Sequence, residues 1–116
     1  MVLVDTSVWI SHLREGNNEL VSLLNNGEVL CHPFIVGENA CGNLKNRTEI
    51  IRLLKSLSGA IVAEAEEILQ FIEYNELMGK GLGYIDIHLL ASALLTDAKL
   101  WTFDRRLDNI ARRVLP

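Results

Sequence analysis

Cysteine is scarce in this chain, and the cysteines and histidines that are present have the wrong spacing for the common metal and disulfide sites. Cys31 and Cys41 form no CxxC pair, and the three histidines form neither an HxH nor an HExxH pattern. The sequence therefore indicates neither a zinc site nor a disulfide framework. Both cysteines lie among apolar residues, so we expect buried free thiols.

Long hydrophobic runs are also missing. No apolar segment approaches the roughly 20 residues that a membrane span needs. The first residues do not form the charged and then apolar pattern of a signal peptide. We therefore expect a cytoplasmic protein without a membrane segment. Its 116 residues, 49% of them hydrophobic, are enough for one domain over residues 1–116 with a core of its own.

Basic residues are outnumbered, with 11 Lys and Arg against 15 Asp and Glu and a net charge of −4. This balance argues against a chain that coats nucleic acid through bulk electrostatics. The positive charge is concentrated in residues 99–116, which hold five basic and two acidic side chains. That segment can contact a polyanion, although a solvated helix face is the commoner explanation for such a pattern.

Short apolar segments alternate with helical ones along the chain. Residues 2–4, 29–31 and 100–103 lack polar alternation, which is typical of strands buried on both faces. Residues 61–62 and 114–115 are further candidates for extended structure. Helical patterns cover about 6–15, 19–25, 33–45, 48–57, 64–78 and 86–96, and a short basic helix follows residue 104. This alternation predicts an α/β fold with a mainly parallel sheet.

Three aspartates stand at the beginnings of predicted helices. Asp5 and Asp104 each follow a predicted strand, at the carboxyl edge of the sheet where ligands of such folds bind. Asp86 follows the loop GKGLG, which lacks the spacing of a phosphate-binding loop. Taken singly, each aspartate is explained as a helix N-cap, worth about 1 kcal/mol.

Glu38 does not fit the capping explanation. It lies inside FIVGENAC, in the middle of an apolar helix, and no basic residue lies within four positions of it. At helical spacing it shares a face with Phe34 and Cys41. A buried lone carboxylate is costly, so we expect Glu38 to be buried and to face a cation.

Carboxylates that converge on one cleft need a counter-ion. Two unit charges 4 Å apart repel by about 4 kcal/mol at an effective dielectric of 20. Oxygen ligands select hard divalent ions such as Mg²⁺ or Mn²⁺. Such an ion orients a water and stabilises the leaving oxygen of a phosphodiester. Ser7 and Thr102, each beside a strand-end acid, are candidates for orienting a carboxylate or a water, and Ser7 is equally well explained as a helix cap.

The sequence resembles the PIN-domain ribonucleases, and among them the VapC-type toxins of toxin–antitoxin pairs. Four segments carry the resemblance, in the order expected along the whole chain: VLVDTSVWI at 2–10, VGENACGNLK at 36–45, GKGLGYIDIHLLASALL at 79–95 and LWTFDRRL at 100–107. The resemblance implies a three-layer α/β/α domain in which helices flank a short sheet. It also implies an RNA-cleaving toxin that slows translation.

The same resemblance implies the site residues. Asp5, Glu38, Asp86 and Asp104 would be catalytic, and Asp5, Asp86 and Asp104 would hold Mg²⁺ or Mn²⁺, with Ser7 and Thr102 as the accompanying hydroxyls. Further expectations are a homodimer, a VapB-type antitoxin whose basic side chains reach the acids, and a tRNA or rRNA substrate. We also expect Lys45, Arg47 and Arg105 to lie along the RNA path.

Two other functions remain open at the level of the sequence. A phosphatase could use Asp5 as nucleophile, but such enzymes usually carry a second acid two residues later, where this chain has Ser7. A catalytically silent module that only grips an antitoxin is the other alternative, and the presence of all four acids argues against it.

Overall fold

The computed structural model describes all residues, 1–116, as seven helices and four strands. The strands are β1 (Val2–Val4), β2 (Val29–Cys31), β3 (Ser58–Gly59) and β4 (Lys99–Trp101). The helices are α1 (Thr6–Glu15), α2 (Asn18–Asn25), α3 (Pro33–Cys41), α4 (Arg47–Ser56), α5 (Ala65–Asn75), α6 (Tyr84–Thr96) and α7 (Arg105–Val114).

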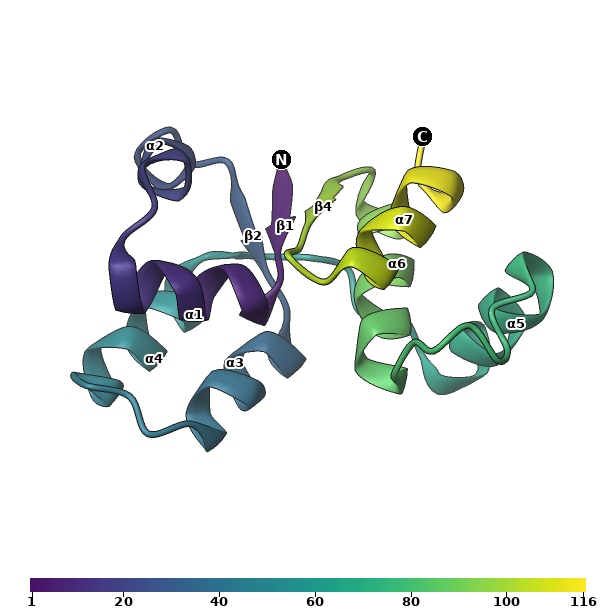
Figure 1. The fold of residues 1–116 in the computed structure, drawn as a ribbon, viewed down its shortest axis with the longest axis horizontal. Coiled ribbons are helices and arrows are strands. Elements are labelled where there is room, and N and C mark those ends of the chain that lie inside the picture. The colour runs from purple at the N-terminus through teal and green to yellow at the C-terminus, as the bar shows by residue number, and fades with distance from the viewer.

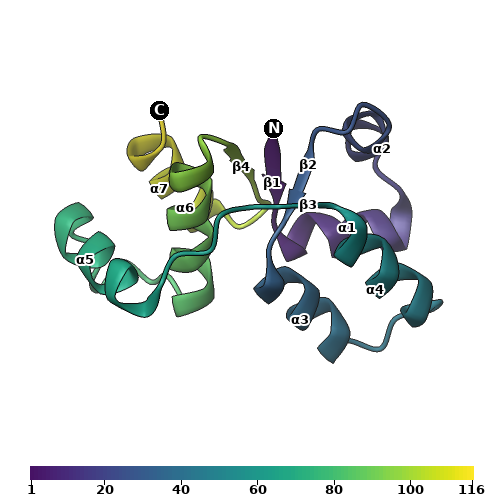
Figure 2. The same ribbon diagram turned by 180° about the vertical axis from the view of Figure 1, so that it is seen from behind.

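The strands form one parallel sheet in the order β3-β2-β1-β4. Leu3 of the central strand β1 is opposite Leu30 on one side and Leu100 on the other. In Figure 1, α1 to α4 gather on one side of the strands and α5 to α7 on the other, and Figure 2 shows the same arrangement from behind. The expected fold, a short parallel sheet flanked by helices, is confirmed.

The apolar side chains of the strands and of the inner helix faces form the core. The main cluster of 18 buried residues includes Leu3, Trp9 and Leu90. A second cluster joins α5 to α6 through Ile68 and Ile87. Helix α6 is buried along most of its length, as its nearly all-apolar sequence predicts. None of the helices combines the length and apolarity that crossing a membrane would require.

Helix α3 ends at Cys41, earlier than the predicted end near residue 45. Arg47 explains this, because its guanidinium donates two hydrogen bonds, of 3.2 and 3.0 Å, to the Ala40 carbonyl at the end of α3. The segment between them includes Asn46 in the left-handed region, with φ of 55°. Cys31 is a buried free thiol as predicted, but Cys41 is exposed, so the prediction for that residue is wrong.

Other boundaries also differ from the predictions. Helix α6 begins at Tyr84, so Asp86 is its third residue and does not open it. Residues 58–59, which directly follow the helix predicted over 48–57, form the edge strand β3. Residues 61–62 and 114–115 form no strand, and Val114 is instead the last residue of α7. Pairing over two residues leaves little sequence signal for β3, and the start of α6 differs by two residues, within the usual variation of helix ends.

Candidate active site

The central strands deliver polar residues to one edge of the sheet. Asp5 directly follows β1, and Thr102 directly follows β4. The two segments remain paired past the strand ends, because the Asp5 amide donates a 2.9 Å hydrogen bond to the Trp101 carbonyl. Parallel pairing therefore places the Asp5 carboxylate beside the Thr102 hydroxyl, although 97 residues separate them in the sequence.

The Asp5 carboxylate is buried, with 7% of the residue exposed. One of its oxygens, Oδ2, accepts hydrogen bonds from Thr102 Oγ1 at 2.7 Å and from Ser7 Oγ at 2.8 Å. Its other oxygen, Oδ1, accepts no hydrogen bond within the protein. Asp5 occupies the N-cap position of α1, yet its side chain makes no capping hydrogen bond. Helix capping therefore does not explain this carboxylate.

The two hydroxyls connect Asp5 to the loop after β4. Ser7 Oγ accepts a hydrogen bond from the Phe103 amide at 3.0 Å, and Thr102 Oγ1 accepts one from the Asp104 amide, also at 3.0 Å. Each hydroxyl thus donates to Asp5 and accepts from the backbone of this loop. The positions of Asp5 and Asp104 are therefore coupled through Ser7 and Thr102.

Asp104 is the N-cap of α7. Its Oδ1 accepts a 3.1 Å hydrogen bond from the Leu107 amide, and the residue is exposed. The capping role predicted as the simplest explanation is present here. It occupies one carboxylate oxygen and leaves the other without a partner in the protein.

Asp86 lies in the first turn of α6, where its Oδ2 accepts a 3.2 Å hydrogen bond from the Gly83 amide. Burial raises the pKa of Asp86, and the carboxylates of Asp5 and Asp104 raise it further, while the Gly83 hydrogen bond opposes these effects. Asp86 is therefore close enough to the other two acids to feel their charge. The three aspartates predicted from separate parts of the chain are thus linked by their electrostatic effect on Asp86.

Glu38 lies at the rim of this site and is exposed, so the prediction that it is buried is wrong. Thr6 directly follows Asp5 in the sequence, and its hydroxyl donates a 2.7 Å hydrogen bond to Glu38 Oε1. The buried polar residue of this helix is instead Asn39, whose Nδ2 donates to the Ile35 carbonyl at 2.9 Å. The inner face of α3 runs through Ile35 and Asn39, one position out of register with the face that the sequence suggested.

None of these acids has a cationic partner. The only ion pair in the structure joins Arg112 to Asp108, at 3.0 Å, on the outer face of α7. Unpaired carboxylates with a free oxygen each are the donors that a hard divalent cation prefers, so the donor chemistry fits Mg²⁺ or Mn²⁺. No three His, Cys, Asp or Glu side chains are grouped tightly enough to hold one ion in this conformation. The carboxylates would therefore have to turn toward it.

The three predicted RNA-binding cations lie in two places. Arg105 is exposed at the start of α7, directly after Asp104. Lys45 follows the C-terminal end of α3, and it lines a groove together with Ile10 and Leu13 of α1. Arg47 is held on the end of α3 by its hydrogen bonds to the Ala40 carbonyl. The structure thus places only Arg105 next to the acids.

A cluster of aromatic and imidazole rings that the sequence did not reveal joins the beginning of α3 to the beginning of α6. His32 follows β2 as Asp5 follows β1, and its ring centroid lies 6.1 Å from that of His88. Phe34 and Tyr84 each pack edge-on against His88, at 4.7 Å. Burial lowers the pKa of His32 to about 4, with a smaller contribution from His88. The one available signal was the position of His32 at a strand end.

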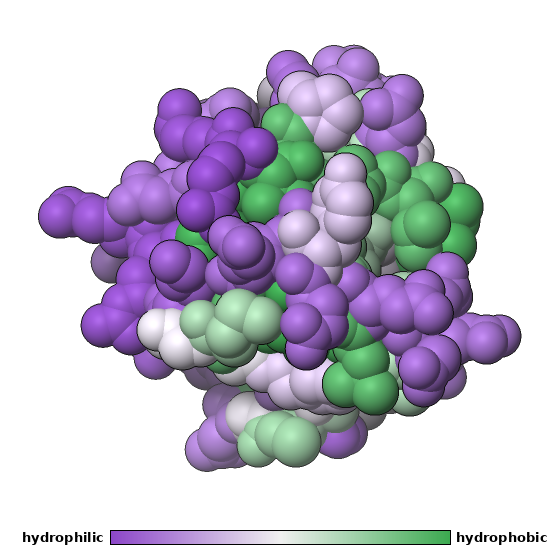
Figure 3. Space-filling view, turned by 90° about the vertical axis from the view of Figure 1, so that its right-hand side faces the viewer, coloured by the Kyte–Doolittle hydropathy of each residue, from purple (hydrophilic) through white to green (hydrophobic).

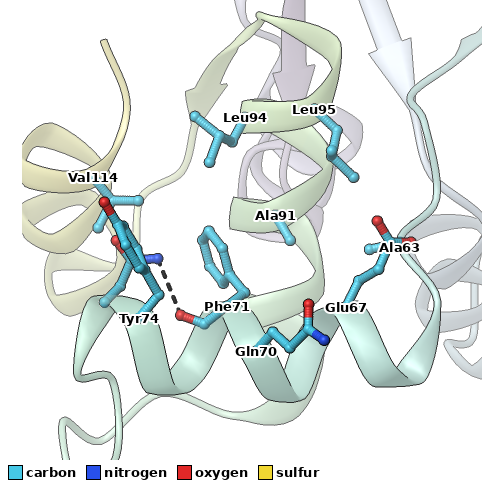
Figure 4. A pocket seen from close by; sticks show the side chains of 10 residues that line it. Ala63, Glu67, Gln70, Phe71, Tyr74, Ala91, Leu94, Leu95 and Val114 are labelled. Atoms are coloured by element: carbon cyan, nitrogen blue, oxygen red, sulfur yellow. Dashed lines mark hydrogen bonds between the residues drawn. The ribbon is translucent and has the colours of Figure 1, made fainter.

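A separate apolar pocket lies between α5 and α6. Figure 4 shows Phe71, Ala91, Leu94 and Leu95 around it, and apolar side chains gather in several places on the face drawn in Figure 3. None of the predicted site residues lines this pocket. It is therefore distinct from the acidic site.

A family model for the PIN domain matches residues 2–113. The chain belongs to the PIN domain family. The resemblance predicted from the four sequence segments is thereby confirmed. Among curated proteins, this PIN domain is similar to Ribonuclease VapC32 from two strains of Mycobacterium tuberculosis. Each is 45% identical over 108 residues, which cover 92% of this chain and 87% of the relative.

A solved structure also resembles this PIN domain. FitAcB from Neisseria gonorrhoeae matches 97% of this chain and 94% of its own, with a TM-score of 0.63 and 21% sequence identity. At this identity the likeness supports the fold alone. The family and the fold therefore rest on independent comparisons, one of sequence and one of structure.

Proposed function

We propose that this protein is a metal-dependent endoribonuclease that hydrolyses RNA phosphodiester bonds. It would act in the cytoplasm as the toxin of a toxin–antitoxin pair that inhibits translation. The observation that carries the proposal is the buried Asp5 carboxylate, which is held by two hydroxyls, lies within electrostatic reach of Asp86 and has no cationic partner. The similarity to Ribonuclease VapC32 supports RNA as the substrate.

The hydrogen bonds of the site support the following proposed roles. Asp5, Asp86 and Asp104 would hold Mg²⁺ or Mn²⁺, which supplies a lowered water pKa and charge neutralisation at the scissile phosphate. Ser7 and Thr102 fix one Asp5 oxygen, and the other oxygen, which has no partner in the protein, would bind the ion. Glu38, which accepts a hydrogen bond from Thr6, would orient the attacking water and accept its proton.

The pKa of Asp86 is raised in the protein when no cation is bound at the site. Bound positive charge would favour the ionised form of this carboxyl group. Binding of the metal and ionisation of Asp86 are therefore coupled, so we expect metal affinity to increase with pH until Asp86 is fully ionised.

The absence of ion pairs at the acids supports the proposed antitoxin partner. Carboxylates without an ion pair form a surface that the basic side chains of a VapB-type antitoxin can neutralise, which would inhibit the enzyme. The homodimer stays a prediction, and the apolar pocket between α5 and α6 offers a surface that a second copy can cover. Light scattering of the purified chain, with and without the antitoxin, tests both assemblies.

Brief expression in cells, followed by mapping of new RNA 5′ ends, tests the function. The wild type is expected to arrest growth and to produce a small set of cleavage sites in tRNA or rRNA, whereas Asp5→Asn is expected to produce neither. If the folded Asn variant kept full activity, the site assignment would be wrong. Growth arrest by both proteins without cleavage would instead favour a module that acts by binding alone.

A further inference from the structure

His32 and His88 are both almost completely buried, with 1% and 5% of the residue exposed. Each carries one buried ring nitrogen that has no hydrogen-bond partner in the protein, Nε2 in His32 and Nδ1 in His88. Buried polar atoms in proteins are nearly always hydrogen-bonded, so two such nitrogens on neighbouring rings need an explanation. The chemistry proposed for the acids uses neither histidine.

The hydrogen bond of His32 to helix α3 determines which of its nitrogens carries the proton. His32 is the N-cap of α3, and its Nδ1 accepts a 3.0 Å hydrogen bond from the Phe34 amide. A neutral imidazole has one nitrogen that accepts and one that donates, so Nε2 carries the hydrogen. Burial lowers the pKa of His32 to about 4, which keeps the ring neutral at pH 7. The Nε2–H group is therefore a buried donor without an acceptor.

This tautomer excludes a metal ion as the partner of His32. A histidine that binds a metal offers a nitrogen lone pair to the ion and donates its other N–H to a neighbour. In His32 the lone pair is already used by the Phe34 amide, and the remaining nitrogen is protonated. The partner of Nε2–H must therefore be a hydrogen-bond acceptor.

His88 supplies an acceptor on the neighbouring ring. The two ring centroids are 6.1 Å apart, and no hydrogen bond joins the imidazoles directly. Two hydrogen bonds in series through one water span up to about 6 Å between nitrogens. Such a water accepts from His32 Nε2–H and donates to His88 Nδ1. The proton of His88 is then on Nε2, which is not among its buried unpartnered atoms.

Aromatic rings surround the two imidazoles. Phe34 packs against both of them, with its centroid 4.9 Å from that of His32 and 4.7 Å from that of His88. Tyr84 packs edge-on against His88, also at 4.7 Å. Aromatic ring faces are only weak acceptors. The two histidine nitrogens are therefore the strong polar groups among these rings, and a water between them would be oriented by both.

The histidine pair joins two parts of the fold. In Figure 1, α3 belongs to the helices on one side of the strands and α6 to those on the other. His32 caps α3, which carries Glu38, and His88 lies in the first half of α6, two residues after Asp86. A link between the two rings would therefore fix the position of one acid relative to the other.

We propose that His32 and His88 bind one water molecule between them, and that this water links α3 to α6 and positions Glu38 relative to Asp86. The two histidines are then positioning residues. The importance of the positioning rests on the proposed function, whereas the water site does not.

NMR of the wild type with ¹⁵N-labelled histidine at pH 7 tests the water site. His32 is expected as the Nε2–H tautomer, with a proton that exchanges slowly enough to be observed and shows a cross-peak to water. His12 is the matched control, because its Nδ1 also accepts an amide hydrogen bond, from Asn17 at 3.0 Å, while the residue is only half-buried. Its Nε2 proton is expected to exchange too fast to be observed.

Two NMR results would overturn the proposal. One is the Nδ1–H tautomer of His32, which contradicts the N-cap hydrogen bond. The other is an observable Nε2–H proton that is shifted upfield and has no cross-peak to water, since that proton would donate to the ring of Phe34 instead.

A double-mutant cycle tests the link between the helices. His32→Asn keeps a capping side chain on α3 but is too short for the water, and His88→Leu removes the acceptor. Each is expected to raise the unfolding equilibrium constant at least about 10-fold. If both act through one water, the effect of the double variant is expected to be about 10-fold smaller than the product of the single effects. Additive effects would overturn the link.

RNA cleavage separates this proposal from the proposed function. His32→Asn and His88→Leu are each expected to lower kcat at least about 10-fold, because the acids are displaced, with KM within about twofold of the wild type. Cleavage with an unchanged kcat in both variants would refute the positioning and keep the ribonuclease. The water cross-peak of His32 in a protein that cleaves no RNA would support the water site and refute the ribonuclease.

Discussion

Replacement of Thr102 by valine removes one hydroxyl at nearly constant shape. Thr102 Oγ1 donates to Asp5 Oδ2 at 2.7 Å and accepts from the Asp104 amide at 3.0 Å. A hydrogen bond to a charged group contributes about 1.5–3 kcal/mol, and an amide left without a partner costs about 1 kcal/mol more. We therefore expect Thr102→Val to lower the free energy of unfolding by about 2.5–4 kcal/mol.

Urea denaturation followed by circular dichroism, in EDTA, measures this loss. For a chain of this size it corresponds to a decrease of roughly 10–16 °C in the midpoint of thermal unfolding. Thr48→Val, at an exposed threonine on α4, is the matched control and is expected to change stability by less than about 0.5 kcal/mol.

A double-mutant cycle with Asp5→Asn assigns the loss to the carboxylate. In that background the hydroxyl meets a neutral amide, so the effect of Thr102→Val is expected to be smaller by about 1 kcal/mol. If Thr102→Val were no more destabilising than Thr48→Val, the hydroxyls would not hold Asp5 and the described network would be wrong. Equal effects in both backgrounds would show that the charge of Asp5 is irrelevant to the contact.

Three further predictions concern the same site. Asp86→Asn is expected to stabilise the metal-free protein at pH 7, because burial and the charges of Asp5 and Asp104 raise the pKa of Asp86. A raised carboxyl pKa means that stability falls as pH rises from the ordinary value of 3.8 toward the raised one, so the gain should disappear in melts below pH 3.8. Mg²⁺ or Mn²⁺ at 100 times its dissociation constant is expected to raise the melting midpoint of the wild type by roughly 10 °C, and not that of Asp5→Asn. Gly81→Ala is expected to destabilise by about 1–2 kcal/mol in urea, because φ is +79°, a conformation that alanine rarely adopts, whereas the flexible Arg106 guanidinium beside the new Cβ can move aside.

The sequence predicted the parts of the site that depend on strand ends. Asp5 and Thr102 each follow an apolar segment, and parallel strands bring such positions to one edge. It did not predict that Asp5 makes no capping hydrogen bond while Asp104 does, because both positions look alike without coordinates. Capping geometry depends on the backbone dihedral angles at the start of the helix, and the sequence pattern does not determine these angles.

The burial of Glu38 was predicted from helical spacing, and it is wrong because α3 is apolar nearly all round. With so weak an amphipathic signal, the sequence does not fix which face turns inward, and the structure buries Asn39 instead. The cluster of His32 and His88 was missed for another reason. The two rings are brought together only by the packing of α6 beside the strand ends.

Cleavage of a single-stranded RNA by the purified protein tests the central claim most directly. Wild type and Asp5→Asn would be compared with Mn²⁺ or Mg²⁺ added, then with EDTA, and then with the metal restored. We predict cleavage by the wild type that EDTA abolishes and metal restores, and a decrease of at least about 100-fold for the folded Asn variant, in line with the loss of a group that stabilises the transition state. Undiminished cleavage by Asp5→Asn, or by the wild type in EDTA, would contradict the account.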